Sequence, residues 1–341
     1  NDAVELLEQV LTQAKADTSS YRKFVDLVLK NRADSKTNQR LNFSALQAYG
    51  MYGSYNQLLN DMSETELRSA DPQALLNLLS QLKNYKHTLL YYGPESLKNV
   101  NKLVSRVHVT PKTFTAIPAG KPYLHQPTTA NEVWLAPYDA KNIYMTMYHC
   151  EDTKFSPSNA SIEALFNEYF CSGMNAIVFQ EIREARGLAY SAGASYVRPY
   201  THPYKDSEYF ATYVISQNDK MMDCINEFNV LLNDMPQREA GFKLAKQTLL
   251  KSLASNRTTR ENVLWSYLRA KQLGIDYDLN ERIYRELPAL TLDNLMDFAR
   301  THIKDKSFRY LILGDEKNLD VKSLEKIAPV RKLTTTEIFG Y

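Results

Sequence analysis

The chain has 341 residues, of which 44% are hydrophobic and 23% charged, and its formal net charge is only +2. These values are typical of globular proteins, and a chain of this length usually forms more than one domain. With 41 basic against 39 acidic residues, no surplus of positive charge is available to neutralise phosphates, which excludes nucleic acid as an expected partner. No stretch approaches the roughly 18 consecutive apolar residues of a membrane span, so no membrane partner is expected either.

The first part of the chain, residues 1–93, is predicted to be mostly helical and matches a later part of the same sequence. Gly53 corresponds to Gly274, and the apolar run at 89–93 corresponds to the run at 310–314. Because such matches keep their order and nearly the same spacing, they indicate a duplicated domain whose first copy is truncated at its N-terminus. The alternative is a short helical domain followed by a larger mixed one.

The second copy follows a proline-rich segment, residues 94–130, which is predicted to connect the two domains and has room for one strand. Residues 131–341 then begin with strands and continue with long helical stretches, a pattern that indicates an α+β sheet covered by helices. The predicted strands are 132–135, 143–148, 188–197, 209–216 and 308–313, and the predicted helices are 162–170, 175–186 and most of 219–300.

The segment around Arg183, Gly187 and Tyr190 carries the most specific chemistry. Arg183 falls in the last turn of a predicted helix, Gly187 suits the left-handed position after a helix end, and Tyr190 opens the next strand. The guanidinium and the phenol can therefore approach one another and offer several donors to a peptide carbonyl or an oxyanion. The alternative is a solvated helix-end arginine and a core tyrosine. Glu181 and Glu184 on the same helix could form paired carboxylates, but their spacing is also common on an exposed helix face, and they are predicted to be surface charges.

At these residues the sequence resembles the C-terminal domain of the pitrilysin/insulinase-type zinc metallopeptidases, also called inverzincins. The resemblance spans nearly the whole chain. It covers the segments 45–56, 67–93, 175–191, 257–268, 308–315 and 337–341, together with the Met235-Pro236 helix break.

The resemblance implies a fold of the mitochondrial-processing-peptidase/insulinase type, with related helix-covered antiparallel-sheet domains. Residues 1–93 would be the C-terminal part of the third family domain, 94–130 the connection, and 131–341 the fourth domain. Arg183 and Tyr190 would then be substrate- and transition-state-binding residues. Relatives are often exported bacterial enzymes, so the resemblance favours an extracytoplasmic location while the compartment stays open.

The zinc motif of this family, H-x-x-E-H, is absent from the sequence, although it contains six histidines. The nearest group of possible ligands, His149-Cys150-Glu151, has no partner histidine nearby and is interpreted as structural. Zinc is therefore expected in the parent enzyme but outside this chain, which should bind no cofactor and be inactive alone. The implied partners are an N-terminal half or a subunit carrying the zinc motif, and peptide substrates. A non-catalytic scaffold of the same fold and a simple peptide-binding module are the alternatives.

Tyr196, Tyr200 and Tyr204 follow Tyr190 closely and could line a substrate chamber, an interpretation that rests on proximity in the sequence alone.

Overall fold

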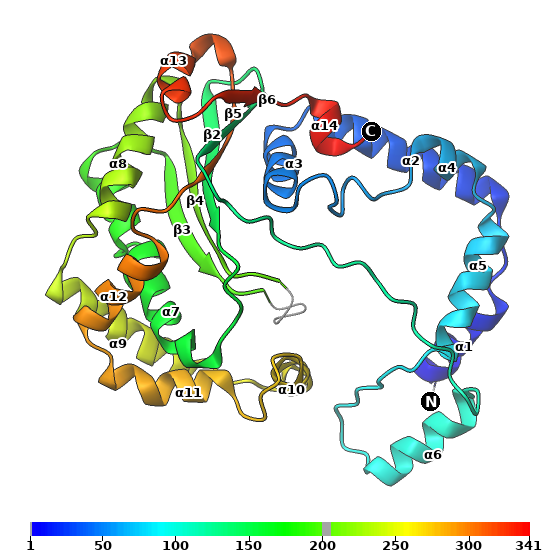
Figure 1. Cartoon of the computed structure of the whole chain (residues 1–341). Coiled ribbons are helices and arrows are strands. Elements are labelled where there is room, and N and C mark those ends of the chain that lie inside the picture. The colour runs from blue at the N-terminus through cyan, green and yellow to red at the C-terminus, as the bar shows by residue number, and fades with distance from the viewer. Residues whose placement is uncertain (1, 200–205) are drawn as a thin grey trace.

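The computed structural model describes residues 2–199 and 206–341, and these form two parts of different character (Figure 1). From residue 132 onward, helices pack against a β-sheet to form a body. Residues 2–36 and 64–107 form an arm of helices that extends away from this body. The segment 108–131 returns from the end of the arm to the sheet without forming a helix or a strand of its own.

The body is built on a six-stranded sheet with the order β3-β4-β2-β5-β1-β6. β1 lies parallel to both of its neighbours, β5 and β6, whereas the remaining neighbouring pairs are antiparallel. The α+β class is thus confirmed, but the expected antiparallel sheet is a mixed one, because β1 pairs with strands that return through long crossovers. The strands are β1 (Glu132–Pro137), β2 (Asn142–Cys150), β3 (Ser191–Val197), β4 (Tyr209–Gln217), β5 (Arg309–Gly314) and β6 (Val330–Lys332).

Helices cover one face of the sheet and enclose the main core (Figure 1). The apolar helix predicted at 162–170 is confirmed, since Leu165, Phe166 and Phe170 are each 0% exposed. Full burial of each such side chain stabilises the fold by roughly 1.5–3 kcal/mol. The helices of the body are α7 (Ala160–Phe166), continued by the π-helix η3 (Asn167–Cys171), α8 (Met221–Asn233), α9 (Glu239–Ser255), α10 (Asn262–Gln272), α11 (Leu279–Glu286) and α12 (Leu292–His302).

The opposite face of the sheet is covered by α3 (Gln39–Tyr52) from the first part of the chain and by α14 (Thr335–Phe339) from the last. Strand residues alternate between the two faces of a sheet, so Leu311 of β5 contacts α3 whereas Ile312 faces the main core. Gly50 allows this close approach, because a Cβ atom there would lie 2.5 Å from Leu311 Cδ1.

The arm has almost no core of its own. α1, α5 and α6 contain no buried residue, α2 buries only Val25, and α4 buries only Leu67. The apolar run 89–93, which matches strand β5, forms no strand here, because the described residues offer it no neighbouring strands. The arm helices are α1 (Asp2–Gln13), α2 (Thr18–Lys36), α4 (Glu64–Ser69), α5 (Pro72–Gln81) and α6 (Leu97–Val107), the last lying within the segment predicted as a connection.

Short elements complete the chain. They are the 3-10 helices η1 (Leu82–Asn84), η2 (Pro157–Asn159), η5 (Asn218–Lys220), η6 (Leu287–Ala289) and η7 (Glu316–Asn318), the π-helix η4 (Phe179–Ala185), and α13 (Val321–Glu325). Within the described ranges, every helix is too short or too polar to cross a membrane.

Candidate functional site

The helix that carries Arg183 is wound differently from the prediction. Its helical backbone begins at Ile177 rather than near residue 175, and η4 forms π-type turns over most of its length. Gly187 has a φ of 59°, so the left-handed conformation predicted for it is confirmed. π-helical turns are rare and occur frequently at functional sites, which favours a functional interpretation of this turn.

Buried neighbours hold the two predicted site residues at the surface. Ile182 is 0% exposed and Ala189 8% exposed, so both are anchored in the main core on either side of the turn at Gly187. The Tyr190 N–H donates to Ile215 O at 2.9 Å, which fixes the start of β3 against β4. The Tyr190 side chain is nevertheless 80% exposed.

Arg183 and Tyr190 do not touch one another. The Arg183 guanidinium lies over the Phe179 ring, 4.9 Å from its centroid, and its Nε is 3.8 Å from Glu184 Oε1. Among the described residues, no hydrogen bond or ring contact joins Arg183 to Tyr190. Each side chain instead projects outward from its own element, so both have donors available to a bound molecule.

The acidic residues of η4 have separate partners. Glu181 pairs with Arg238, whereas Glu184 lies beside Arg183. They therefore do not form a carboxylate pair of the kind that acid–base catalysis requires. Glu184, whose side chain is 52% exposed, is a surface charge as predicted, whereas the Glu181 side chain is only 15% exposed beneath Arg238.

The free edge of the sheet beside this site is covered. The Asn167 amide donates to Tyr196 O at 2.9 Å and accepts from Tyr196 N at 2.8 Å. Ser172 Oγ donates to Ala194 O at 3.3 Å. These side chains occupy backbone groups of β3 that an added strand would need, so a peptide cannot extend the sheet along this part of the edge.

The group His149-Cys150-Glu151 is engaged in structural contacts. His149 Nδ1 donates to Ser307 O at 2.8 Å, and Glu151 pairs with Lys306 at 2.5 Å. In the part of the chain that the structure describes, no three or more His, Cys, Asp or Glu side chains come together in a way that could hold a metal ion.

The sequence segment that contains Arg183 and Tyr190 matches a known family. Residues 88–249 match the model described as "Peptidase M16 inactive domain". This part of the chain belongs to the peptidase M16 inactive-domain family. The pitrilysin/insulinase resemblance is thereby confirmed at the level of the family.

Solved structures share the fold of most of this chain. A peptidase M16 inactive domain from Pseudomonas fluorescens is 15% identical, with a TM-score of 0.66 over 92% of this chain and 74% of that one. The periplasmic protease PqqL from Escherichia coli is 13% identical, with a TM-score of 0.64 over 89% of this chain but 33% of PqqL. The ferredoxin protease FusC, in complex with Arabidopsis ferredoxin, is 9% identical, with a TM-score of 0.70 over 92% of this chain but 34% of FusC. No curated protein sequence matches the chain.

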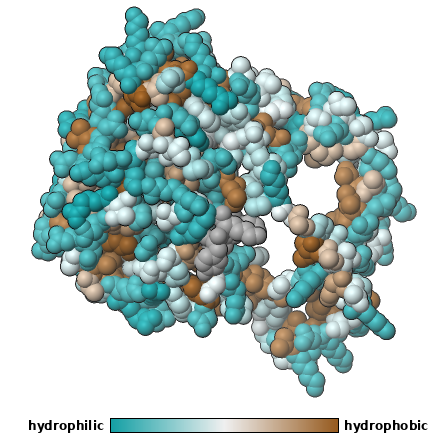
Figure 2. All heavy atoms as spheres, viewed as in Figure 1, coloured by the Kyte–Doolittle hydropathy of each residue, from teal (hydrophilic) through white to brown (hydrophobic). Residues whose placement is uncertain are grey.

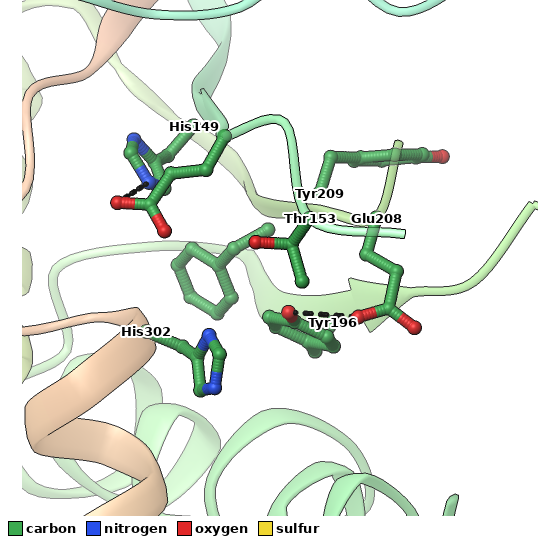
Figure 3. Close-up of a pocket in the computed structure, with 8 residues that line it drawn as sticks. His149, Thr153, Tyr196, Glu208, Tyr209 and His302 are labelled. Atoms are coloured by element: carbon green, nitrogen blue, oxygen red, sulfur yellow. Dashed lines mark hydrogen bonds and ion pairs between the residues drawn. The ribbon is translucent and has the colours of Figure 1, made fainter. Parts of the chain in front are cut away.

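The body also contains a buried polar cluster that could not be predicted from the sequence. His149, Tyr196, Glu208 and His302 converge on a cavity of about 10 Å³, with room for about one water molecule (Figure 3). Tyr196 Oη donates to Glu208 Oε2 at 3.2 Å. Burial lowers the pKa of both His149 and His302, so both are expected to be neutral near pH 7.

Two buried carboxyl groups form the acidic side of this cluster. Glu163 is 1% and Glu208 2% exposed, and Arg198 Nε lies 3.2 Å from Glu163 Oε2. Burial, followed by the charge of the neighbouring carboxylate, raises the pKa of Glu163 above its ordinary value, and burial raises that of Glu208. If Glu163 and Glu208 share one proton, the pair carries a single negative charge opposite Arg198. A buried site is less destabilised by one paired charge than by two carboxylates beside one arginine.

The interpretation that Tyr196, Tyr200 and Tyr204 together line a substrate chamber is not supported for Tyr196. Tyr196 is 7% exposed and belongs to the core, because its phenol is turned inward to Glu208. Tyr200 and Tyr204 lie outside the described residues.

Proposed function

We propose that this chain is the substrate-binding half of a zinc-dependent endopeptidase that acts on peptides or small unfolded polypeptides. Arg183 and Tyr190 orient the peptide, and the Arg183 guanidinium and Tyr190 phenol donate to the oxygen of the scissile carbonyl as negative charge develops on it. The observation that carries this proposal is the exposure of both side chains on either side of the Gly187 turn, within the segment that matches the M16 family.

Zinc belongs to another part of this proposed enzyme. The donor set of the described residues does not fit a zinc site, since no three His, Cys, Asp or Glu side chains are arranged so that they could hold a metal ion. The metal would supply an activated water when bound by an H-x-x-E-H helix in an N-terminal half or a partner subunit. Residues of this chain bind and position the peptide, and the chain alone is expected to be inactive.

The arm supports the presence of such a partner. Leu6, Leu78 and Leu97 are 61%, 62% and 75% exposed, on three different helices of the arm. Exposed apolar side chains on neighbouring helices of one part of a protein are typical of surfaces that another polypeptide covers. An N-terminal half, or a subunit that carries the zinc motif, is the partner proposed for this surface.

The test compares hydrolysis of a quenched fluorescent peptide by the enzyme reconstituted from both halves. Arg183→Ala is expected to lower kcat/KM by about 100-fold or more, as loss of a transition-state donor does. Tyr190→Phe removes only the hydroxyl group and is expected to have a smaller effect in the same direction. Arg300→Ala is the matched control, because its side chain is 64% exposed and pairs locally with Asp297.

The same assay separates this proposal from its alternatives. A scaffold of the M16 fold would show no hydrolysis in any assembly that contains zinc. A simple peptide-binding module would show no hydrolysis in the wild type, and Arg183→Ala would only lower its affinity for the peptide. If the reconstituted enzyme is active and Arg183→Ala behaves as Arg300→Ala does, the proposed role of Arg183 is wrong.

A further inference from the structure

Helix α10 is packed unlike the other helices of the body. None of its residues is buried, although it contains Val263, Trp265 and Tyr267, which are 48%, 59% and 58% exposed. Figure 1 places α10 at the margin of the body that faces the arm. A helix that exposes tryptophan and tyrosine side chains together offers rigid anchors of the kind enriched at binding sites.

Two adjoining cavities flank this helix. One, of about 470 Å³, lies between the Val263 and Tyr267 face of α10 and the segment 275–280, and the other, of about 460 Å³, includes Trp265. Thr258, Ser266, Arg269 and Asn280 line both, so the cavities form one continuous depression, the α10 groove. Each volume lies within the range of ligand sites in proteins.

The floor of the α10 groove is apolar and fixed. Leu273 and Ile275 are buried together with Phe155 in a small cluster of their own, and Ala270 and Leu279 pack against it. An apolar side chain entering the groove would therefore be placed against a preformed surface. Preformed sites bind more tightly because little ordering is required when the ligand arrives.

The charge of the lining favours an acidic ligand. Arg198 already pairs with Glu163, and Asp278 accepts a hydrogen bond from Asn280 N at 2.9 Å as the cap of α11. Basic side chains outnumber acidic ones in the lining. With Arg198 set aside because it pairs with Glu163, they are Arg257, Arg269 and Lys271 against Asp276 and Asp278.

The dimensions fit an extended chain. α10 has 11 residues, which at about 1.5 Å per residue gives a groove of roughly 16 Å, the length of about five residues in extended conformation. We propose that the α10 groove is a second site for polypeptide substrates, which takes an extended segment with acidic side chains flanking an apolar or aromatic one. This rests on the proposed function and names a substrate class for it.

Binding to the full chain can be measured without hydrolysis. The probe is a fluorescein-labelled peptide of about eight residues that alternates Asp or Glu with Leu or Phe, long enough to exceed the groove. Fluorescence anisotropy is expected to show binding at least about tenfold tighter than for the same peptide with Lys at the acidic positions. Trp265→Ala and Arg257→Glu are each expected to weaken binding of the acidic peptide by about tenfold.

The controls keep this inference separate from the proposed active site. Arg300→Glu makes the same change of charge as Arg257→Glu on a distant helix and is expected to leave the affinity unchanged. Arg183→Ala is expected to leave the ratio of the affinities for the acidic and the Lys peptides unchanged, because the proposed role of Arg183 is at a peptide carbonyl oxygen and not at an acidic side chain. Circular dichroism verifies that each variant is folded. Trp265→Ala is expected to fold, because the Trp265 side chain is 59% exposed and contributes little to the core.

Equal affinity for the acidic and the Lys peptides would overturn the proposal, as would binding that survives Trp265→Ala and Arg257→Glu. Absence of binding at about millimolar peptide would also overturn it. None of these results affects the hydrolysis test of Arg183, which can succeed or fail independently.

Discussion

The buried carboxyl groups of Glu163 and Glu208 make the stability of the body dependent on pH. Their pKa values are raised above the ordinary glutamate value of 4.5, mainly by burial. Between the unfolded and the folded pKa, the folded state binds more protons than the unfolded state. The stabilisation is therefore complete below about pH 4.5 and is lost as the pH rises through the folded values.

Glu163→Gln tests this dependence, because an amide keeps the shape of the protonated carboxyl group and cannot ionise. The variant is expected to be more stable than the wild type at pH 9 by about 1–2 kcal/mol and nearly equal to it at pH 5. Urea unfolding at the two pH values measures the difference. Glu184→Gln, at a side chain that is 52% exposed, is the control and is expected to show no such dependence.

Residue-scale prediction from the sequence succeeded where the cause is local. Gly187 was predicted to be left-handed because a helix ends there, and its φ of 59° agrees. The Glu163–Glu208 pair could not be predicted, since only the packing of α7 against the strands brings the two residues together. The close approach of the Arg183 and Tyr190 side chains that the spacing allowed is not seen, for a related reason. Sequence spacing determines neither the direction of a side chain nor its contacts, and the Arg183 guanidinium lies over the Phe179 ring instead.

At the scale of elements, α3 is tied to the body by a few large side chains. Phe43 is 2% exposed and its ring meets that of Tyr144 edge-on, with centroids 5.6 Å apart. Phe43→Ala is expected to destabilise the protein by about 3–5 kcal/mol, because it leaves a cavity between α3 and the sheet. Phe24→Ala on α2, where the ring is 55% exposed, is expected to change the free energy of unfolding in urea by less than about 0.5 kcal/mol. Similar losses in both variants would contradict the docking role of Phe43.

Most elements of the body could be predicted because their apolar residues recur at the helical or strand period over many residues. β1, β2, β4 and β5 appear at the predicted positions within a few residues. β6 and α14 were missed, since three- and five-residue elements contain too little pattern, and they form only through contacts with β1 and α3. The π-helical winding of η4 was also missed, because apolar spacing distinguishes poorly between α- and π-turns.

At the scale of the whole molecule, the arm and the body differ in how much apolar surface they bury. Figure 2 shows an opening between the two parts and hydrophobic side chains at the surface of the arm. α1, α5 and α6 bury no residue, whereas α8 buries residues along its length, among them Ile225, Phe228 and Leu231. Helices without a core rely on marginal intrinsic stability, so the arm is expected to open locally with a low free energy.

Amide hydrogen exchange followed by mass spectrometry can test this difference and the proposed partner together. In the chain alone, amides of α1, α5 and α6 are expected to exchange at least about 100-fold faster than those of α8. Adding the half that carries the zinc motif is expected to slow exchange in the arm and leave α8 unchanged, because only the arm gains buried contacts. The segment 89–93 should become protected as well, since new strands would give its backbone groups partners. Equal protection of the arm and α8 in the isolated chain would show that the arm is already covered, and the partner surface assigned to it would then be wrong.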